Sequence, residues 1–196
     1  MEIASRPGQR YVALLKRASK AAVPALADGL AIDRGAAAEA FAAAASLVLA
    51  GLSRHQRLHP ADLRAAGDLV AEYGSPADVS APELAIGAHL ARLDPSPRLG
   101  GLLGETATRA VAWLADRTGE SPEALARALA ASAPLALGAL GSSGSPHAVE
   151  AWVGELSDAP LSDPARLESD GGAEGEAFRR LRRRGMPWLH RMLAST

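Results

Sequence analysis

The chain has 196 residues, and its 21 basic and 22 acidic side chains give a formal charge of −1, so the molecule as a whole is not an electrostatic binder of nucleic acid. It contains no cysteine, which excludes disulfides, iron–sulfur clusters and thiol catalysis. The opening residues lack the basic-then-apolar order of a signal peptide, and no run reaches the roughly 18 continuous apolar residues of a spanning helix. We therefore expect a cytoplasmic protein.

The hydrophobic pattern predicts helices and no strands. β-Branched and aromatic residues are scarce, and no run alternates apolar and polar side chains. Turn-forming residues at 73–76 and 94–98 separate the segments, and residues 53–60 are a polar connector. The predicted helices span residues 10–28, 35–52, 60–72, 82–93, 102–116, 122–140 and 146–156. The fold class is therefore all-α, a compact bundle of short helices.

Apolar spacing also predicts which side of each helix faces the core. Pro24 should bend the first helix, and Ser80 should cap the helix that begins with Pro82 and Glu83. The residues expected to face inward are Tyr11, Leu14, Leu15, Ala18, Ala22 and Leu26 in the first helix, Leu63, Leu69 and Val70 in the third, and Leu84, Ile86, Leu90 and Leu93 in the fourth.

One stretch occurs twice in the chain. Residues 26–53, LADGLAIDRGAAAEAFAAAASLVLAGLS, align without a gap with residues 114–141, LADRTGESPEALARALAASAPLALGALG. In the second copy Gly119 suits the left-handed residue that closes a helix, and Ser121 suits the N-cap of the next one. Asp33 takes the place of Ser121 in the first copy. We expect two related helical units, with Pro134 bending or restarting the second copy's helix.

Residues 100–141, GGLLGETATRAVAWLADRTGESPEALARALAASAPLALGALG, resemble the bacterial domain-of-unknown-function family 937, which includes the YidB-like proteins. The likeness rests on the Gly-Leu-rich entry, the capped helix start and the closing Ala-Pro-Leu and Gly-Ala-Leu. The first copy, ending in SLVLAGLS, is similar to the family's other helical unit, whereas residues 54–93 depart from its usual spacing. The resemblance covers about residues 21–156. It implies an all-helical cytoplasmic bacterial domain without catalytic residues to carry over.

The composition divides the chain into three parts. Residues 1–156 form the predicted helical domain, with related halves at about 10–93 and 98–156. Residues 157–176 are acidic, contain proline and glycine, and predict a flexible linker. Residues 177–196 form a basic amphipathic tail. Its predicted apolar face contains Phe178, Leu181, Trp188, Leu189 and Met192, and its basic side contains Arg179, Arg180, Arg182, Arg183 and Arg184.

Three interpretations of this tail stay open. It is a last helix that folds back on its own domain, a docking peptide for a protein partner or a neighbouring subunit, or a segment that binds nucleic acid or an anionic membrane.

No group of residues predicts an active site. His55 and His59 have the i, i+4 spacing of a helical metal site, but Pro60 and the polar connector favour a loop. The glycine-serine segment at 141–145 lacks the preceding strand and the lysine of a phosphate loop. We therefore expect no enzyme, no metal, no cofactor and no small-molecule substrate.

Trp113 and Trp152 lie on alanine-rich helices, where a large aromatic side chain anchors either a core or a subunit contact. Alanine buries little apolar area, so an oligomer would bury more. The sequence therefore favours a self-assembling or partner-binding bacterial protein that uses small-residue helix faces and a C-terminal docking tail. The alternative is a nucleic-acid- or membrane-associated regulatory protein that acts through the arginines of the tail.

Overall fold

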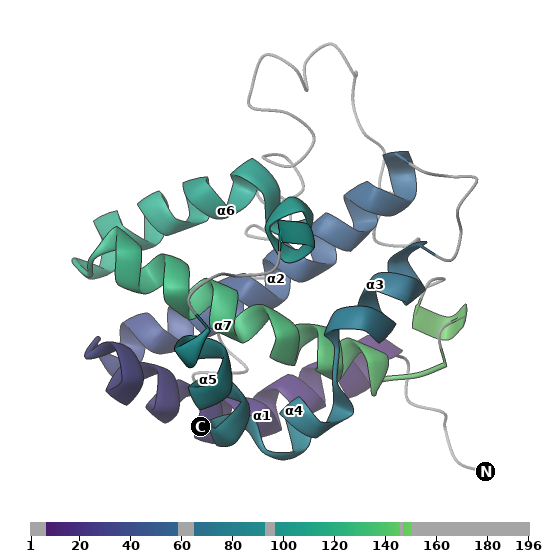
Figure 1. The fold of residues 1–196 in the computed structure, drawn as a ribbon, viewed down its shortest axis with the longest axis horizontal. Coiled ribbons are helices and arrows are strands. Elements are labelled where there is room, and N and C mark those ends of the chain that lie inside the picture. The colour runs from purple at the N-terminus through teal and green to yellow at the C-terminus, as the bar shows by residue number, and fades with distance from the viewer. Residues whose placement is uncertain (1–6, 59–64, 93–96, 146, 150–196) are drawn as a thin grey trace.

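The computed structural model describes residues 7–58, 65–92, 97–145 and 147–149, and this part of the chain is helical without strands. The all-α prediction is confirmed (Figure 1). Residues 147–149 are the described part of the helix expected after residue 146. The longer elements are α1 (Pro7–Leu30), α2 (Arg34–Leu58), α3 (Ala65–Tyr73), α4 (Pro76–Ser80), α5 (Pro82–Ala91), α6 (Pro97–Thr118) and α7 (Pro122–Gly141).

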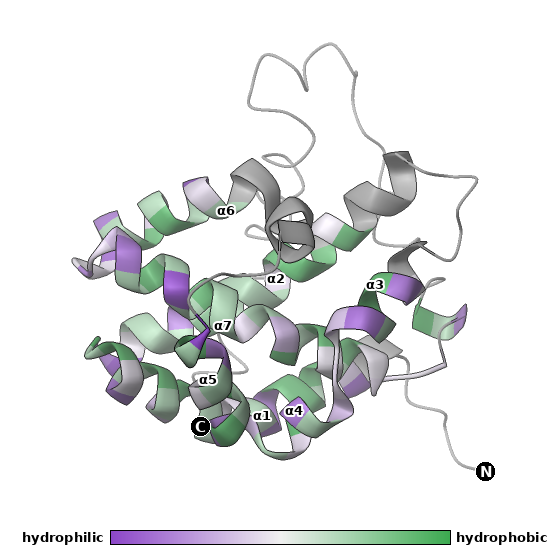
Figure 2. Cartoon of the chain, in the orientation of Figure 1, coloured by the Kyte–Doolittle hydropathy of each residue, from purple (hydrophilic) through white to green (hydrophobic). Residues whose placement is uncertain are grey.

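Helix α7 crosses the middle of the bundle and contacts each of the other six helices (Figure 1). All of its residues from Ala131 to Leu140 are buried, so this half of the helix has no solvent-facing side. Figure 2 shows hydrophilic residues gathered near the beginning of α7 and apolar colours beyond them. Within the described residues α7 is also the helix that is long and apolar enough to cross a membrane, and its burial inside the bundle explains that composition equally well.

Helix α2 makes the most extensive contact with α7. Every residue from Ala40 to Leu49 is buried, and half of them are alanines. Small side chains allow two helix backbones to approach closely, and Phe41 and Leu47 supply the larger apolar contacts. The alanine-rich stretch of α2 is therefore packed inside the chain.

Tyr11 is a buried aromatic side chain of α1 that contacts α2. Its hydroxyl donates a hydrogen bond of 3.2 Å to the carbonyl oxygen of Ala45. Burial raises the pKa of the phenol well above its usual value, because the ionised form would lose its hydration. The apolar face predicted for α1 is confirmed, with Leu14 partly buried and its five other members buried.

Prolines occur inside two helices without ending them. Pro24 lies within α1 and Pro134 within α7, so the helix of the second copy does not restart. Each proline lacks the N–H that the preceding turn would use. Ser46 stands where the second copy has Pro134, and α2 continues through it as expected.

Both repeated stretches have a left-handed residue at the helix–helix corner, and the hydrogen bonds that close the two corners differ by one residue. Ala31 and Gly119, which are aligned, both have positive φ, 53° and 75°. The carbonyl oxygen of Ala115 accepts from the amide of Gly119 at 2.9 Å. The carbonyl oxygen of Ala27, which aligns with Ala115, accepts from the amide of Ile32 at 3.1 Å. Each corner is therefore a left-handed helix end followed directly by a new helix start.

Side chains cap both new helices as predicted. Asp33 Oδ1 accepts from the amide of Gly35 at 2.7 Å, and Ser121 Oγ accepts from the amide of Ala124 at 3.1 Å. Pro122 and Glu123 occupy the first turn of α7, where proline needs no donor and a carboxylate suits the helix dipole.

Three sequence predictions between the repeats were wrong in detail. Helix α2 continues to Leu58, so the first six residues of the predicted connector are helical. Ser75 caps an additional short helix, α4, by accepting from the amide of Ala77. Ser80 does not cap α5: its hydroxyl donates to the carbonyl of Pro76, and Ala81 stands at the N-cap without a side-chain bond.

Candidate docking groove between α1 and α5

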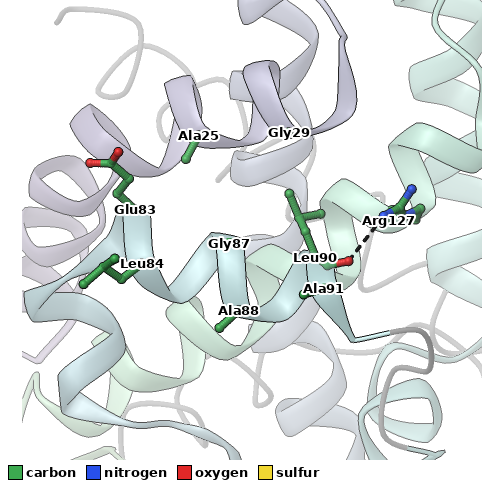
Figure 3. Close-up of a pocket in the computed structure, with 9 residues that line it drawn as sticks. All are labelled: Ala25, Gly29, Glu83, Leu84, Gly87, Ala88, Leu90, Ala91 and Arg127. Atoms are coloured by element: carbon green, nitrogen blue, oxygen red, sulfur yellow. Dashed lines mark hydrogen bonds between the residues drawn. The ribbon is translucent and has the colours of Figure 1, made fainter.

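An open groove with a volume of about 650 Å³ runs between α1 and α5 (Figure 3). Its lining is apolar or small apart from one carboxylate and one guanidinium. Helix α1 contributes two small residues, α7 contributes one arginine, and α5 contributes the rest. The lining residues are Ala25, Gly29, Glu83, Leu84, Gly87, Ala88, Leu90, Ala91 and Arg127.

The groove exists because α5 is apolar on nearly all sides. Ala85 and Ile86 are buried against the bundle, whereas residues on the other side of α5 face solvent. We define the outer row as Leu84, Gly87, Ala88 and Ala91, all of which are exposed. Their spacing of three, one and three residues places them on one side of a helix. Leu84 is 76% exposed and is the large hydrophobic side chain most open to solvent in the described chain.

Close packing of α1 against α5 forms the floor of the groove. A Cβ atom built on Gly29 would lie 2.7 Å from Leu90 Cδ1, so the glycine allows the two helices to come together. Gly29 and Ala25 lie one turn apart on α1 and add a second pair of small residues to the surface. Small residues of α1 therefore line the groove opposite α5.

The two charged residues lie at opposite ends of the groove. Glu83 stands in the first turn of α5, where the helix dipole favours a carboxylate. Arg127 reaches from α7 to the other end, where its Nη2 donates to the carbonyl of Leu90 at 3.3 Å. This bond supplies a donor to the last turn of α5. Figure 3 shows Glu83 and Arg127 separated by the length of the outer row.

A separate polar cluster joins the two repeated corners. Arg117 Nε lies 3.0 Å and 2.9 Å from the two carboxylate oxygens of Glu39, linking α6 to α2. Glu120 Oε1 accepts from the amide of Asp33 at 2.7 Å. The guanidinium of Arg117 also lies over the ring of Trp113, 5.5 Å from its centroid. These contacts hold the two helical units to each other within one chain.

Trp113 is partly buried and packs against the core. Its side chain therefore contributes to the core of one chain, and its role in a subunit contact stays a prediction. Trp152 lies outside the described residues, as do the tail residues Phe178, Leu181, Trp188, Leu189 and Met192 and the arginines 179, 180, 182, 183 and 184. The docking role of the tail stays a prediction.

The described chain also contains a histidine–carboxylate pair outside the groove. His89 Nε2 lies 3.1 Å from Asp78 Oδ2 and links α5 to α4. His55 is in the helical part of α2, while His59 is outside the described residues. The described chain brings no three histidine or acidic side chains together in an arrangement that would hold a metal ion.

The outer row was not predicted from the sequence, because the predicted core-facing side of α5 included Leu84. Leu84 was expected to face inward, but Ile86 is buried and lies almost opposite Leu84 on a helix. Leu90 is partly buried, in agreement with the prediction. The signal that identifies the groove is the second apolar spacing, which begins at Leu84 and passes through Gly87 and Ala88.

No family model matches the chain, and no curated protein or solved structure matches it.

Proposed function

We propose that this chain is a non-enzymatic, self-assembling helical protein whose copies associate through the groove between α1 and α5. The observation that carries the proposal is Leu84, which is 76% exposed within a row of small residues. A leucine surrounded by alanine and glycine is a knob beside shallow holes, and this is the surface that a second helix fits.

The size of the surface indicates a weak association. Burying a leucine contributes about 1.5–3 kcal/mol, and a symmetric pair would bury two of them. Lost translational and rotational freedom opposes binding by at least about 4 kcal/mol. The two leucines roughly offset that loss, so the small residues of both outer rows have to bury the further apolar area that makes the dimer form. The proposal sets the Kd of this reversible dimer on the order of tens of micromolar, which corresponds to a net binding free energy of about −6 kcal/mol.

The remaining features of the proposal come from the sequence. The resemblance to domain-of-unknown-function family 937 supports a cytoplasmic bacterial protein, and the sequence offers no motif for a cofactor or a small-molecule substrate. The alternative, a regulatory protein that binds nucleic acid or an anionic membrane through its C-terminal arginines, rests on residues outside the described chain. The groove supports the first proposal because its lining is mainly apolar.

The test is sedimentation velocity of the full chain over about 1–300 µM, a range that brackets the expected Kd. The wild-type protein should show a monomer–dimer equilibrium, and Leu84→Glu should shift it to monomer, because a buried unpaired carboxylate opposes the contact. Ala71→Glu adds the same charge at an exposed alanine of α3 and should leave the equilibrium unchanged. A monomeric wild type, or a Leu84→Glu variant that still dimerises, would contradict the proposal. Equal thermal melts of the two variants exclude unfolding as the cause.

A further inference from the structure

The groove has opposite charges at its two ends, and this arrangement determines how a second copy fits. Glu83 lies at the beginning of α5, and Arg127 lies beside Leu90 near its end. Between them the outer row carries no charge. A surface with this pattern is complementary to itself when one copy is turned end to end.

We infer that two copies pack as a twofold dimer in which their α5 helices run antiparallel, with Glu83 of each protomer against the partner's Arg127. The inference rests on the proposed function and goes beyond it by fixing the orientation and the recognition chemistry of the interface.

The position of Gly87 provides the geometric argument. It lies in the middle of the outer row, and a Cβ atom built on it would have nothing within 4 Å. If the two helices cross at Gly87, their backbones approach closely because neither has a side chain at the crossing point. Leu84 of one protomer then lies beside the partner's Leu90 and Ala91, and its exposed side chain enters the partner's groove.

The same crossing brings the charges together. In an antiparallel pair centred on Gly87, Glu83 lies opposite the partner's Ala91, one residue beyond the carbonyl that Arg127 binds. The twofold axis makes this contact twice. A parallel pair would instead place like charges at each end, which opposes association. Charge therefore selects the antiparallel arrangement, while Leu84 and the small residues supply the apolar contact.

Charge reversal tests the arrangement. Glu83→Arg gives each copy two basic ends, and Arg127→Glu gives each copy two acidic ends. Each variant alone should dimerise about tenfold more weakly than the wild type, since both pairs change from attractive to repulsive. A mixture of the two variants should form heterodimers with an affinity within about threefold of the wild-type value, because both pairs are then opposite in charge. The double variant, which exchanges the charges in one chain, should likewise recover as a homodimer.

The readout is sedimentation velocity of the full chain with a fluorescent label on one variant, at low salt, where pairing of exposed charges is strongest. If the single variants dimerised weakly because they were misfolded, mixing them would not restore dimers, because each chain keeps its own substitution. Failure of the mixture and the double variant to recover would overturn the antiparallel arrangement. If Leu84→Glu still abolishes the dimer in that case, the proposed function stands and this inference alone fails. If Leu84→Glu has no effect, the proposed function itself fails.

Discussion

Ala31 and Gly119 occupy the same place in the two helix–helix corners, and both have positive φ, 53° and 75°. Glycine adopts this conformation without strain, whereas the Cβ atom of alanine crowds the neighbouring carbonyl. The two corners therefore perform the same turn, and only the first of them is strained.

Replacing Ala31 with glycine should stabilise the protein. The relief of left-handed strain exceeds the extra chain entropy of glycine, so the free energy of unfolding should rise by about 0.5–1 kcal/mol. Gly119→Ala should lower it by about 1 kcal/mol for the converse reason. Urea unfolding of dilute protein, followed by circular dichroism, measures both changes.

Ala13→Gly is the matched control, because Ala13 is exposed in the interior of α1. There the loss of helix propensity should lower the free energy of unfolding by about 1 kcal/mol. Stability that falls in both Ala→Gly variants would show that the conformation of Ala31 carries no strain.

Gly138 makes the second glycine prediction, for reasons of space rather than conformation. A Cβ atom there would meet the carbonyl oxygen of Ser75 and lie 3.1 Å from Val79 Cγ2. The Ser75 carbonyl belongs to backbone that accepts from the amide of Asp78, so it is held in place. Gly138→Ala should lower the free energy of unfolding by about 1–3 kcal/mol, the usual cost of overpacking a core.

Gly87→Ala is the control for this substitution, since Gly87 is also helical but has open space around it. In dilute protein, where the monomer dominates, Gly87→Ala should raise the free energy of unfolding by up to about 1 kcal/mol. Equal effects of the two substitutions would mean that α7 tolerates an additional methyl group against the turn before α4.

Arg117 and Glu39 give a prediction about the contact between the repeats. The Arg117 side chain is 55% exposed and that of Glu39 15%, so solvent screens their interaction only in part. A double-mutant cycle with Arg117→Met and Glu39→Gln should give a coupling energy of about 0.5–1 kcal/mol. The coupling should shrink in 1 M salt, where the Debye length is about 3 Å. A coupling near zero at low salt would show that the corner is held by the other contacts alone.

The starts of α2, α5 and α7 were predicted to within one residue because their signals are local. The caps at Asp33 and Ser121 depend on residues within one turn of the helix, and both are present in the structure. Helix α4 was missed because Ser75 and Pro76, which begin it, also fit a simple break between helices.

The candidate site was harder to predict, for a physical reason. Helix α5 is apolar on nearly every side, so the spacing of its hydrophobic residues does not select the side that faces the core. Ile86 is buried and Leu84 is exposed because α1 and α7 cover one side only. That choice is made by contacts between segments far apart in the chain, and Arg127 reaches the groove for the same reason.

Tyr11 gives a prediction about alkaline stability. Burial raises the pKa of its hydroxyl in the folded state, while in the unfolded chain it titrates near its ordinary value of about 10. Below pH 10 both states keep the proton, so the difference has no effect. Above pH 10 the unfolded state loses the proton and the folded state keeps it, so the free energy of unfolding falls by up to about 1.4 kcal/mol per pH unit from this group.

Tyr11→Phe should cost about 1 kcal/mol at pH 7 through the lost hydrogen bond to Ala45, and it should show a shallower decline between pH 10 and 11.5. Urea unfolding at several pH values, compared between the two proteins, measures the difference in slope. Parallel declines in wild type and Tyr11→Phe would show that the phenol ionises equally in both states.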